Sequence, residues 1–279
     1  MKILFRSVLN KAVDIFYNDE KYLKIFFSKG IQNFGDVVTP ILIEKLSGKK
    51  IRYIGKPKYF KNTNLLAIGS ILHLASKDSI VWGSGFMDPE KKCYEKPKKV
   101  FAVRGPKTRE LLLSQGVQCP EVYGDPALLL PLIYAPKIIK KYELGIIPHY
   151  TDKNNVWLVQ FNNLENIKII DVQNKNTLHF IDDILSCEKI ASSSLHGIIT
   201  ADAYGIPSTW IEFSDKVHGF KFMDYFLSVK RTDTKPLKVT EGTTLDAINS
   251  TFYDYKTDID LNKLLDSAPF SLKYKYSKV

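Results

Sequence analysis

The sequence predicts an α/β protein in which two Rossmann-like halves face a central cleft. Short apolar runs alternate with helix-like stretches through most of the 279 residues. This rhythm breaks once, at 131–143 (PLIYAPKIIKKYE), where two prolines and a lysine cluster occur, and then restarts. Strands that alternate with helices are typical of βαβ units in a parallel sheet. The break therefore divides the chain into two such units.

The first half is predicted to hold two helices. Segment 35–50 has apolar residues at helical spacing and a glycine after its last turn, and segment 104–116 has Pro106 in its first turn and Gly116 at its end. Apolar runs that end in glycine or polar residues are predicted to be buried strands. These runs are 64–70 (NLLAIGS), 79–85 (SIVWGSG), 98–104 (KKVFAVR) and 121–129 (EVYGDPALL).

The second half repeats the pattern. Strands are predicted within 144–150, 166–173 and 207–213, and the stretch 180–194 leads as a buried strand into a helix at 195–204. The tail beyond residue 241 again has helical apolar spacing. The predicted organisation is a domain at 1–135, a second domain at 136–240 and a helical tail at 241–279 that packs back on the first domain.

The composition is typical of a globular protein, with 44% hydrophobic and 25% charged residues. No apolar stretch approaches the roughly 20 residues that a membrane span needs. The N-terminal segment carries frequent charges and has no small-residue cleavage site, so we expect mature protein and not a signal peptide. Three cysteines without paired spacing favour a reducing cytoplasm over a disulfide framework.

The net charge of +10 favours acidic partners such as phosphates and carboxylates. Much of the excess charge lies in three lysine clusters, KPKYFK (56–61), EKKCYEKPKK (90–99) and KIIKKYE (137–143). No nucleic-acid-binding motif accompanies these clusters, so we expect no nucleic-acid partner. The same clusters favour peripheral association with the anionic inner face of the cytoplasmic membrane. The alternative is that they are solvated surface lysines.

Ligands of doubly wound sheets bind beyond the carboxyl ends of strands, where loops enter helices. Arg104 lies at such a junction, in VRGP, and is suited to clamp a carboxylate or phosphate beside helix N-terminal amides. The alternative is a structural arginine that bridges loops. Other polar, glycine-rich junctions are NFGD (33–36), IGS (68–70), WGSG (82–85), YGDP (123–126) and SSSLHG (192–197).

The motif SSSLHG combines hydroxyls with an imidazole. Ser192, Ser193 and Ser194 are suited to cap the following helix, whose exposed N–H groups would form an anion pocket with His196. The imidazole has an ordinary pKa of about 6.5 and is suited to general acid–base chemistry. The alternative is a structural histidine under a helix cap. The serines lack the G-x-S-x-G frame of a hydrolase nucleophile.

Other charged residues have two interpretations each. Asp36 and Asp125 are candidate sugar-hydroxyl acceptors or bases, but both are suited to cap helices, and for Asp125 we favour the cap. Lys216 and His218 follow the last predicted strand and are suited to reach the cleft, or else lie in a solvated loop. We expect no metal site, because the remaining histidines have no partner at metal-ligand spacing. Phosphate-loop and dinucleotide fingerprints are also missing from the sequence.

Four motifs occur in the order found in the bacterial polysaccharide pyruvyl transferase family. They are NFGDVVTPILIEKL, VRGPKTRELL, YGDPALLLP and SSSLHGIITADAYGIPSTWIE. The chain resembles that family over about residues 30–230. The resemblance implies a GT-B-like fold and a transfer of pyruvate, as a ketal, from phosphoenolpyruvate to a sugar of a capsule, exopolysaccharide or cell-wall glycan precursor. Phosphate is released, no cofactor takes part, and the acceptor is often lipid-linked.

The resemblance also implies roles for residues. Arg104 matches the family's donor-binding arginine, His196 matches its motif histidine, and Lys216 matches a downstream basic residue. With Ser193 and Ser194, these residues form the expected phosphoenolpyruvate site. Many family members carry an arginine where this chain has Ser194, which leaves open whether anion binding here relies on Arg104 and Lys216 instead.

The expected catalytic set is His196, Arg104 and Asp36, while acceptor hydroxyls are expected at Asn33, Asp36, Gly69 and Ser70. The sequence is also compatible with two other functions. A GT-B glycosyltransferase would use a nucleotide sugar, with Glu212 as the acidic residue for the ribose. A non-catalytic glycan- or anion-binding protein would not consume phosphoenolpyruvate.

Overall fold

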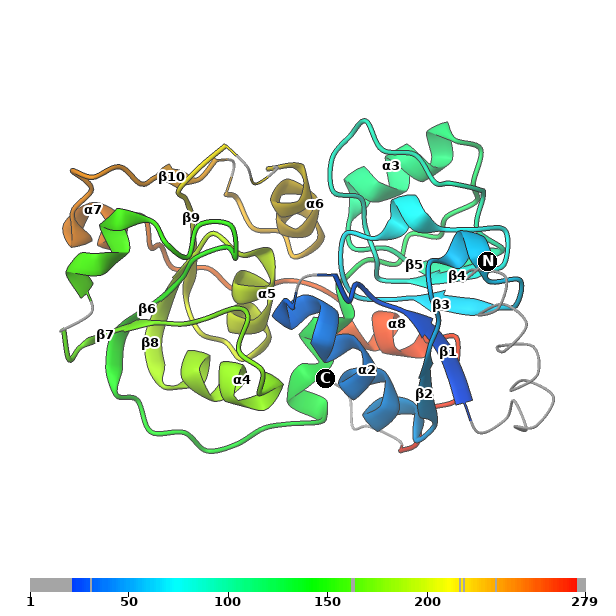
Figure 1. The fold of residues 1–279 in the computed structure, drawn as a ribbon, viewed down its shortest axis with the longest axis horizontal. Helices are drawn as coiled ribbons and strands as arrows, with labels where there is room; N and C mark the ends of the chain where they lie inside the picture. The colour runs from blue at the N-terminus through cyan, green and yellow to red at the C-terminus, as the bar shows by residue number, and fades with distance from the viewer. Residues whose placement is uncertain are drawn as a thin grey trace.

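Two parallel five-stranded sheets form the frame of the molecule, one in each half (Figure 1). The structure is a computed structural model that describes residues 22–30, 32–161, 164–215, 217, 219–233 and 235–274. The strand order of the first sheet is β2-β1-β3-β4-β5, and that of the second is β10-β9-β8-β6-β7. The α/β prediction with two Rossmann-like halves is confirmed at this level, and the GT-B assignment stays a prediction.

The two sheets share one topology. In each half, the second strand lies on one side of the first strand, and the later strands follow on the other side. The direction in which successive strands are added to the sheet therefore reverses between β1 and β3 in one sheet and between β6 and β8 in the other. The first sheet consists of β1 (Tyr22–Phe26), β2 (Lys50–Tyr53), β3 (Asn64–Leu66), β4 (Ser79–Trp82) and β5 (Lys99–Ala102). The second consists of β6 (Tyr142–Ile147), β7 (Ile167–Ile169), β8 (Cys187–Ser192), β9 (Ser208–Glu212) and β10 (Leu237–Lys238).

Helices connect the strands and cover the sheets. Helix α2 begins after Asn33, which has extended backbone dihedrals, and ends at Gly48. Gly48 has φ of 69°, and its N–H donates to Glu44 O at 2.9 Å, as in a left-handed helix cap. The α-helices are α2 (Phe34–Ser47), α3 (Pro106–Ser114), α4 (Thr177–Leu185), α5 (Leu195–Ala203), α6 (Phe220–Ser228), α7 (Leu245–Asn249) and α8 (Leu261–Asp266). The 3₁₀ helices are η2 (Pro57–Tyr59), η3 (Leu72–Leu74), η4 (Pro126–Leu132) and η5 (Val156–Phe161).

The two halves share a hydrophobic core. One cluster of buried side chains includes residues of α2 and η4 from the first half together with residues of α4, α5 and α6 from the second. The Phe34 ring of α2 lies 4.2 Å from the Phe180 ring of α4, centroid to centroid. Because this core continues from one half to the other, it fixes the loops of both sheets relative to each other.

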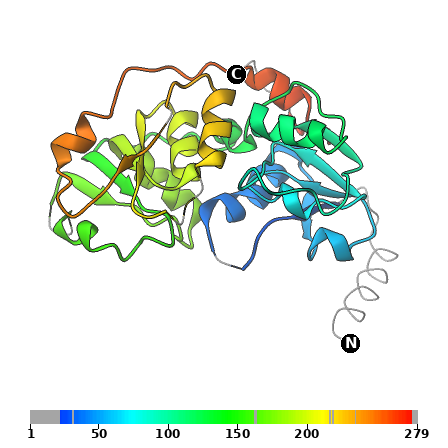
Figure 2. The same ribbon diagram turned by 90° about the horizontal axis from the view of Figure 1, so that it is seen from above.

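The C-terminal segment crosses from the second half to the first (Figure 2). Helix α7 packs with Leu245 and Ile248 against the core of the second sheet. Helix α8 lies against the first sheet, where the Trp82 indole Nε1 donates to Leu264 O at 3.0 Å. The tail thus belongs to both halves.

Two predicted elements differ in the structure. Segment 121–129 is not a full strand: Tyr123 makes a single parallel bridge with Val103, and η4 follows, because Pro126 begins a helical turn that Asp125 caps. Segment 180–194 divides into the end of α4 and strand β8. The expectation for the N-terminal segment lies outside the described residues. The domain limits stay predictions. Among the described helices, none combines the length and apolar character needed to cross a bilayer.

Candidate functional site

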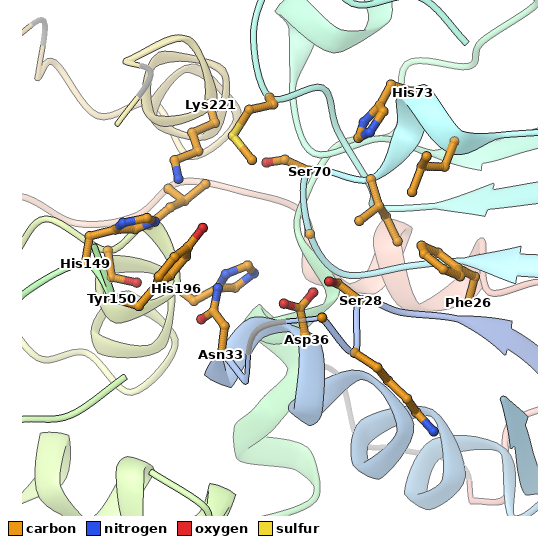
Figure 3. A pocket seen from close by; sticks show the side chains of 18 of the residues that line it. Phe26, Ser28, Asn33, Asp36, Ser70, His73, His149, Tyr150, His196 and Lys221 are labelled. Carbon is orange, nitrogen blue, oxygen red and sulfur yellow. The ribbon is translucent and has the colours of Figure 1, made fainter. Parts of the chain in front are cut away.

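A pocket of about 740 Å³ lies where the two halves meet (Figure 3). Most of its lining comes from the loops after β1, β3, β6 and β8, which are the strands at the two points where the order of strand addition reverses. Open parallel sheets bind ligands at these switch points, beyond the carboxyl ends of the strands. The pocket is therefore built from the switch points of both sheets.

Six of the predicted site residues line this one pocket. Each lies at the end of a strand or in the first turn of a helix, as the sequence pattern indicates. They are Asn33, Asp36, Gly69, Ser70, Ser194 and His196. The structure thus brings together residues of the two halves that the sequence places about 160 positions apart.

His196 occupies the first turn of α5 and is 9% exposed. Its ring packs so closely on the start of α2 that a Cβ at Gly35 would overlap the imidazole. Its Nε2 atom is buried and lies 3.5 Å from Asp125 Oδ2. The other ring nitrogen, Nδ1, is on the side of Gly35, near the pocket residue Asp36 (Figure 3).

Asp36 lies in the first turn of α2 and lines the pocket. Burial raises the pKa of its carboxyl from 3.8 to about 6, although His196 and the backbone N–H of Ser28 oppose the shift. A carboxylate with this pKa is ionised near neutrality and still basic enough to accept a proton. Asn33, at the N-cap position of α2, has its Oδ1 buried with no partner among the described residues.

Lys221 supplies a cation to the pocket from α6. The side chain is 93% buried, since its exposed fraction is 7%. Among the described residues, no carboxylate lies within ion-pair distance of its ammonium group. Burial, and then the Arg104 charge, lower the pKa of Lys221 from 10.5 to about 8, so the ammonium remains the main form at neutral pH. A buried, unpaired ammonium that borders a cavity is suited to bind an anion.

His149 and Tyr150 line the pocket after β6, and Figure 3 shows the Lys221 ammonium pointing toward His149. The His149 Nδ1 atom lies 2.8 Å from Thr151 Oγ1, and its ring packs 4.2 Å from that of Tyr150. Burial, and then Lys221, lower the pKa of His149 to about 3, so this imidazole is neutral. It is suited to hydrogen bonding and not to carrying charge.

The guanidinium of Arg104 lies behind the pocket wall and is fully buried. Its Nε donates to Asp224 Oδ2 at 3.0 Å, and its Nη2 donates to Phe86 O at 2.6 Å. Its Nη1 donates to Ser70 Oγ at 2.7 Å, which leaves the Ser70 hydroxyl hydrogen free to point into the pocket. Arg104 is not among the described residues that line the pocket, so in this structure it supports Ser70 and does not face a ligand.

The three serines before His196 have different positions. The Ser192 hydroxyl accepts from Ser194 N at 3.0 Å, and that of Ser193 accepts from His149 N at 2.7 Å. Both are buried inside the fold, and of the three only Ser194 is among the described lining residues. Ser193 therefore holds the His149 loop in place, and its contact with a ligand stays a prediction.

Other residues that the sequence pattern indicated are not in the lining of this pocket as the structure describes it. Lys216 and His218 are outside the described residues. Asp125 caps η4, as favoured, with Oδ1 accepting from Ala127 N at 3.0 Å. Glu212 does not line the pocket within the described part of the chain, and its Oε2 atom lies 4.0 Å from Lys238 Nζ. The described residues gather no group of three His, Cys, Asp or Glu side chains suited to a metal ion, and a metal-free reaction stays a prediction.

The sequence interpretation missed Lys221, His149 and Tyr150. His149 and Tyr150 follow β6, the strand at the switch point of the second sheet, so the rule applied to Asp36 and His196 would also have indicated them. Lys221 has no such signal. It is flanked by Phe220 and Phe222 in α6, and its position in the wall of the pocket depends on how α6 packs.

Comparisons with known proteins identify one family and two relatives. A sequence model of the polysaccharide pyruvyl transferase family matches residues 7–215. An uncharacterised protein of Acanthamoeba polyphaga mimivirus is 31% identical over 209 residues, which cover 72% of this chain and 71% of that protein. The succinoglycan biosynthesis protein ExoV of Rhizobium meliloti is 26% identical over 202 residues, which cover 70% of this chain and 62% of ExoV.

Among solved structures, a functionally uncharacterised protein of Klebsiella pneumoniae matches with a TM-score of 0.45 and 14% identity, over 85% of this chain and 98% of that one.

The two sheets and the pocket at their switch points define an α/β protein with one pocket shared by both halves. The family match extends over the strands of the first sheet and most of those of the second. The chain belongs to the polysaccharide pyruvyl transferase family.

Proposed function

We propose that this protein transfers pyruvate from phosphoenolpyruvate to two hydroxyls of a saccharide, forming a cyclic ketal and releasing phosphate. The observation that carries the proposal is the joint placement of His196, Asp36 and the unpaired ammonium of Lys221 around one pocket. Family membership supports pyruvate transfer to a polysaccharide. The choice of phosphoenolpyruvate as the donor follows what the family resemblance implies, and the buried ammonium of Lys221 suits an anionic donor of this kind.

The donor is proposed to bind on the side of the second half. Phosphoenolpyruvate carries a phosphate and a carboxylate, and Lys221 offers a buried positive charge to one of them. Ser194 lies at the N-terminus of α5, where backbone N–H groups and the helix dipole favour an anion. The neutral imidazole of His149 and the hydroxyl of Ser70 complete a set of hydrogen-bonding groups around this end.

The reaction needs proton transfer at two stages. A proton adds to the methylene carbon of the enol while one sugar hydroxyl attacks the neighbouring carbon and loses its own proton. The second hydroxyl then displaces phosphate, which leaves with that hydroxyl's proton. We assign the proton transfers to His196 and Asp36, because both line the pocket and Asp36 has a pKa of about 6. Asn33 and the backbone at Gly69 are assigned to the acceptor sugar.

The finer parts of the proposal concern the acceptor and its location. We propose an acceptor sugar on a glycan precursor that is presented at the cytoplasmic face of the membrane, where a net charge of +10 favours an anionic surface. Phosphoenolpyruvate is proposed as a donor substrate, and no cofactor is assigned.

The test is to incubate the purified protein with phosphoenolpyruvate and a panel of model and lipid-linked saccharides. The expected result is release of phosphate together with a gain on the saccharide of the mass of pyruvic acid less one water. Replacing His196 by Gln should lower turnover by about 10²-fold or more. Replacing Lys221 by Met should raise the KM for phosphoenolpyruvate by about tenfold to hundredfold, since one charge-assisted contact is lost.

The matched control is Lys45→Met, because Lys45 is an exposed residue of α2. Consumption of a nucleotide sugar in place of phosphoenolpyruvate would support the glycosyltransferase alternative, which the position of Glu212 outside the pocket disfavours. Weak or no binding of phosphoenolpyruvate, with no consumption across the whole panel, would support the non-catalytic alternative and overturn the proposal.

A further inference from the structure

One oxygen of the Asp125 carboxyl group accepts a hydrogen bond from a backbone N–H, and the other oxygen lies near a histidine ring. Its Oδ1 accepts from Ala127 N at 3.0 Å and so caps η4. Its Oδ2 lies 3.5 Å from His196 Nε2. Asp125 is fully buried, and neither Oδ2 nor Nε2 has a hydrogen-bond partner among the described residues. Buried polar atoms are nearly always paired, and the separation of 3.5 Å makes each of these two atoms a candidate partner for the other.

Both members of this pair are held from several sides. The first turn of η4 fixes Asp125 through the backbone cap, and the next two residues, Pro126 and Ala127, are buried. His196 is held by α5, and its ring cannot move toward α2 because Gly35 lies against it. The charged group that faces the ring from α2 is Asp36, and the one from η4 is Asp125.

We propose that Asp125 is a positioning residue that fixes the tautomer and orientation of His196. The Nε2–H group donates to Asp125 Oδ2, and Nδ1 is left without a proton on the side of α2, whose Asp36 lines the pocket. Nδ1 is then the atom that takes up and returns a proton during turnover. Asp125 also stabilises the imidazolium that forms after proton uptake, because a buried carboxylate lies beside it. The assignment of Asp125 to pyruvate transfer rests on the proposed function, whereas the tautomer is a property of the protein alone.

The Asp125→Asn variant tests the proposal, because the cap hydrogen bond from Ala127 N fixes the orientation of the Asn side-chain amide. Its amide oxygen must accept from Ala127 N, as Oδ1 of Asp125 does, so its NH₂ group faces His196. An NH₂ group can only donate, and it therefore requires Nε2 without a proton. The variant is thus expected to move the proton of the neutral ring to Nδ1 while it retains the cap and the shape of the side chain.

Nitrogen NMR of the imidazole rings reads the tautomer without any substrate. The His196 signal is identified by its loss in His196→Gln. In the wild-type protein at a pH where the ring is neutral, Nε2 is expected to carry the proton, and in Asp125→Asn it is expected to be on Nδ1. A wild-type ring protonated at Nδ1, or a tautomer that Asp125→Asn leaves unchanged, would overturn the proposal.

The kinetic readout depends on the reaction itself. Asp125→Asn should lower kcat by about 10²-fold with the KM for phosphoenolpyruvate close to that of the wild type, because the donor contacts remain. Adding it to His196→Gln should cause little further loss. The matched control is Asp260→Asn, since Asp260 also caps a helix through its side chain but is exposed. It should change neither tautomer nor rate, and an equal loss of kcat in both variants would reduce Asp125 to a structural cap.

The two proposals fail in different ways. If the wild-type protein releases no phosphate from phosphoenolpyruvate, the proposed function fails, and the NMR result still decides whether Asp125 fixes the His196 tautomer. If phosphate is released and the tautomer does not respond to Asp125, only the positioning role fails.

Discussion

At the scale of single residues, the charge of the groups in the pocket depends on burial. Asp36 and Lys221 both titrate nearer to neutrality than their ordinary values, one raised to about 6 and the other lowered to about 8. Between these two values the pocket holds a carboxylate and an ammonium group at once. This is the combination that a reaction between an anionic donor and a hydroxyl acceptor requires.

The raised pKa of Asp36 predicts how activity depends on pH. If Asp36 accepts a proton from the acceptor, kcat/KM for the acceptor should rise with pH and level off above about 6. Asp36→Asn should be less active and should lose this rise. A rise centred near the ordinary value of 3.8 would show that the carboxyl titrates as an exposed aspartate does.

The same shift predicts a change in stability, with a definite sign. The folded state binds the Asp36 proton more tightly than the unfolded state, because the pKa is higher in the folded state. The contribution of this group to stability is therefore present below about pH 3.8 and is lost as pH rises toward about 6. In urea unfolding across this range, the wild-type protein should lose stability relative to Asp36→Asn.

At the scale of elements, the contact between α2 and α5 depends on a glycine. Gly35 lies in the first turn of α2, and its lack of a side chain leaves room for the His196 ring. The same close packing aligns the N-terminus of α2 with the SSSLHG loop, so residues of both halves face one pocket. The residue type at position 35 is thus a condition for the position of the imidazole.

Gly35→Ala should displace the His196 ring. In an open helix position, Ala in place of Gly adds roughly 0.5–1 kcal/mol of stability, but overpacking in a filled site costs about 1–3 kcal/mol. We expect lower stability together with a large loss of turnover, measured by urea unfolding and phosphate release. The control is Gly55→Ala, because a Cβ there meets open space. A variant with unchanged turnover would show that the ring position is not restricted by α2.

At the scale of the whole molecule, a buried ion pair joins the two halves. Arg104 of the first half and Asp224 in α6 of the second are both fully buried, with Nη2 and Oδ2 at 3.0 Å. Asp224 also accepts from the Thr108 backbone N and hydroxyl, at 2.9 and 2.7 Å. Because Lys221 lies in the same helix as Asp224, this contact sets where the Lys221 ammonium lies relative to the loops of the first sheet.

Asp224→Ala should be strongly destabilising, because it leaves the Arg104 charge buried without its partner. Removing one member of a buried ion pair costs about 3–5 kcal/mol. The free energy of unfolding in urea measures this loss. Asp258→Ala is the matched control: Asp258 pairs with Lys230 at the exposed surface, where the loss should be about 0–1 kcal/mol. Similar losses in the two variants would contradict the structural role assigned to Arg104.

The sequence alone indicated both parallel sheets, helices at 35–50 and 104–116, and six of the residues that line the pocket; the structure has these helices at Phe34–Ser47 and Pro106–Ser114. These features depend on local rules: the alternation of apolar runs with helices, glycine and proline at helix ends, and polar loops beyond strand ends. Segment 121–129 was mispredicted because a capped turn at Asp125 outweighed the apolar run that follows it.

Only the tertiary structure decided which charged groups are free and which are paired. Arg104 is paired with Asp224, 120 positions away in the chain, and therefore does not face the pocket, whereas Lys221 does. Asp125 approaches His196 from a 3₁₀ helix of the other half. Such pairings depend on how the two halves pack, and burial then sets the charge of each group. Local patterns in the sequence determine where strands end, but they do not determine which side chains meet there.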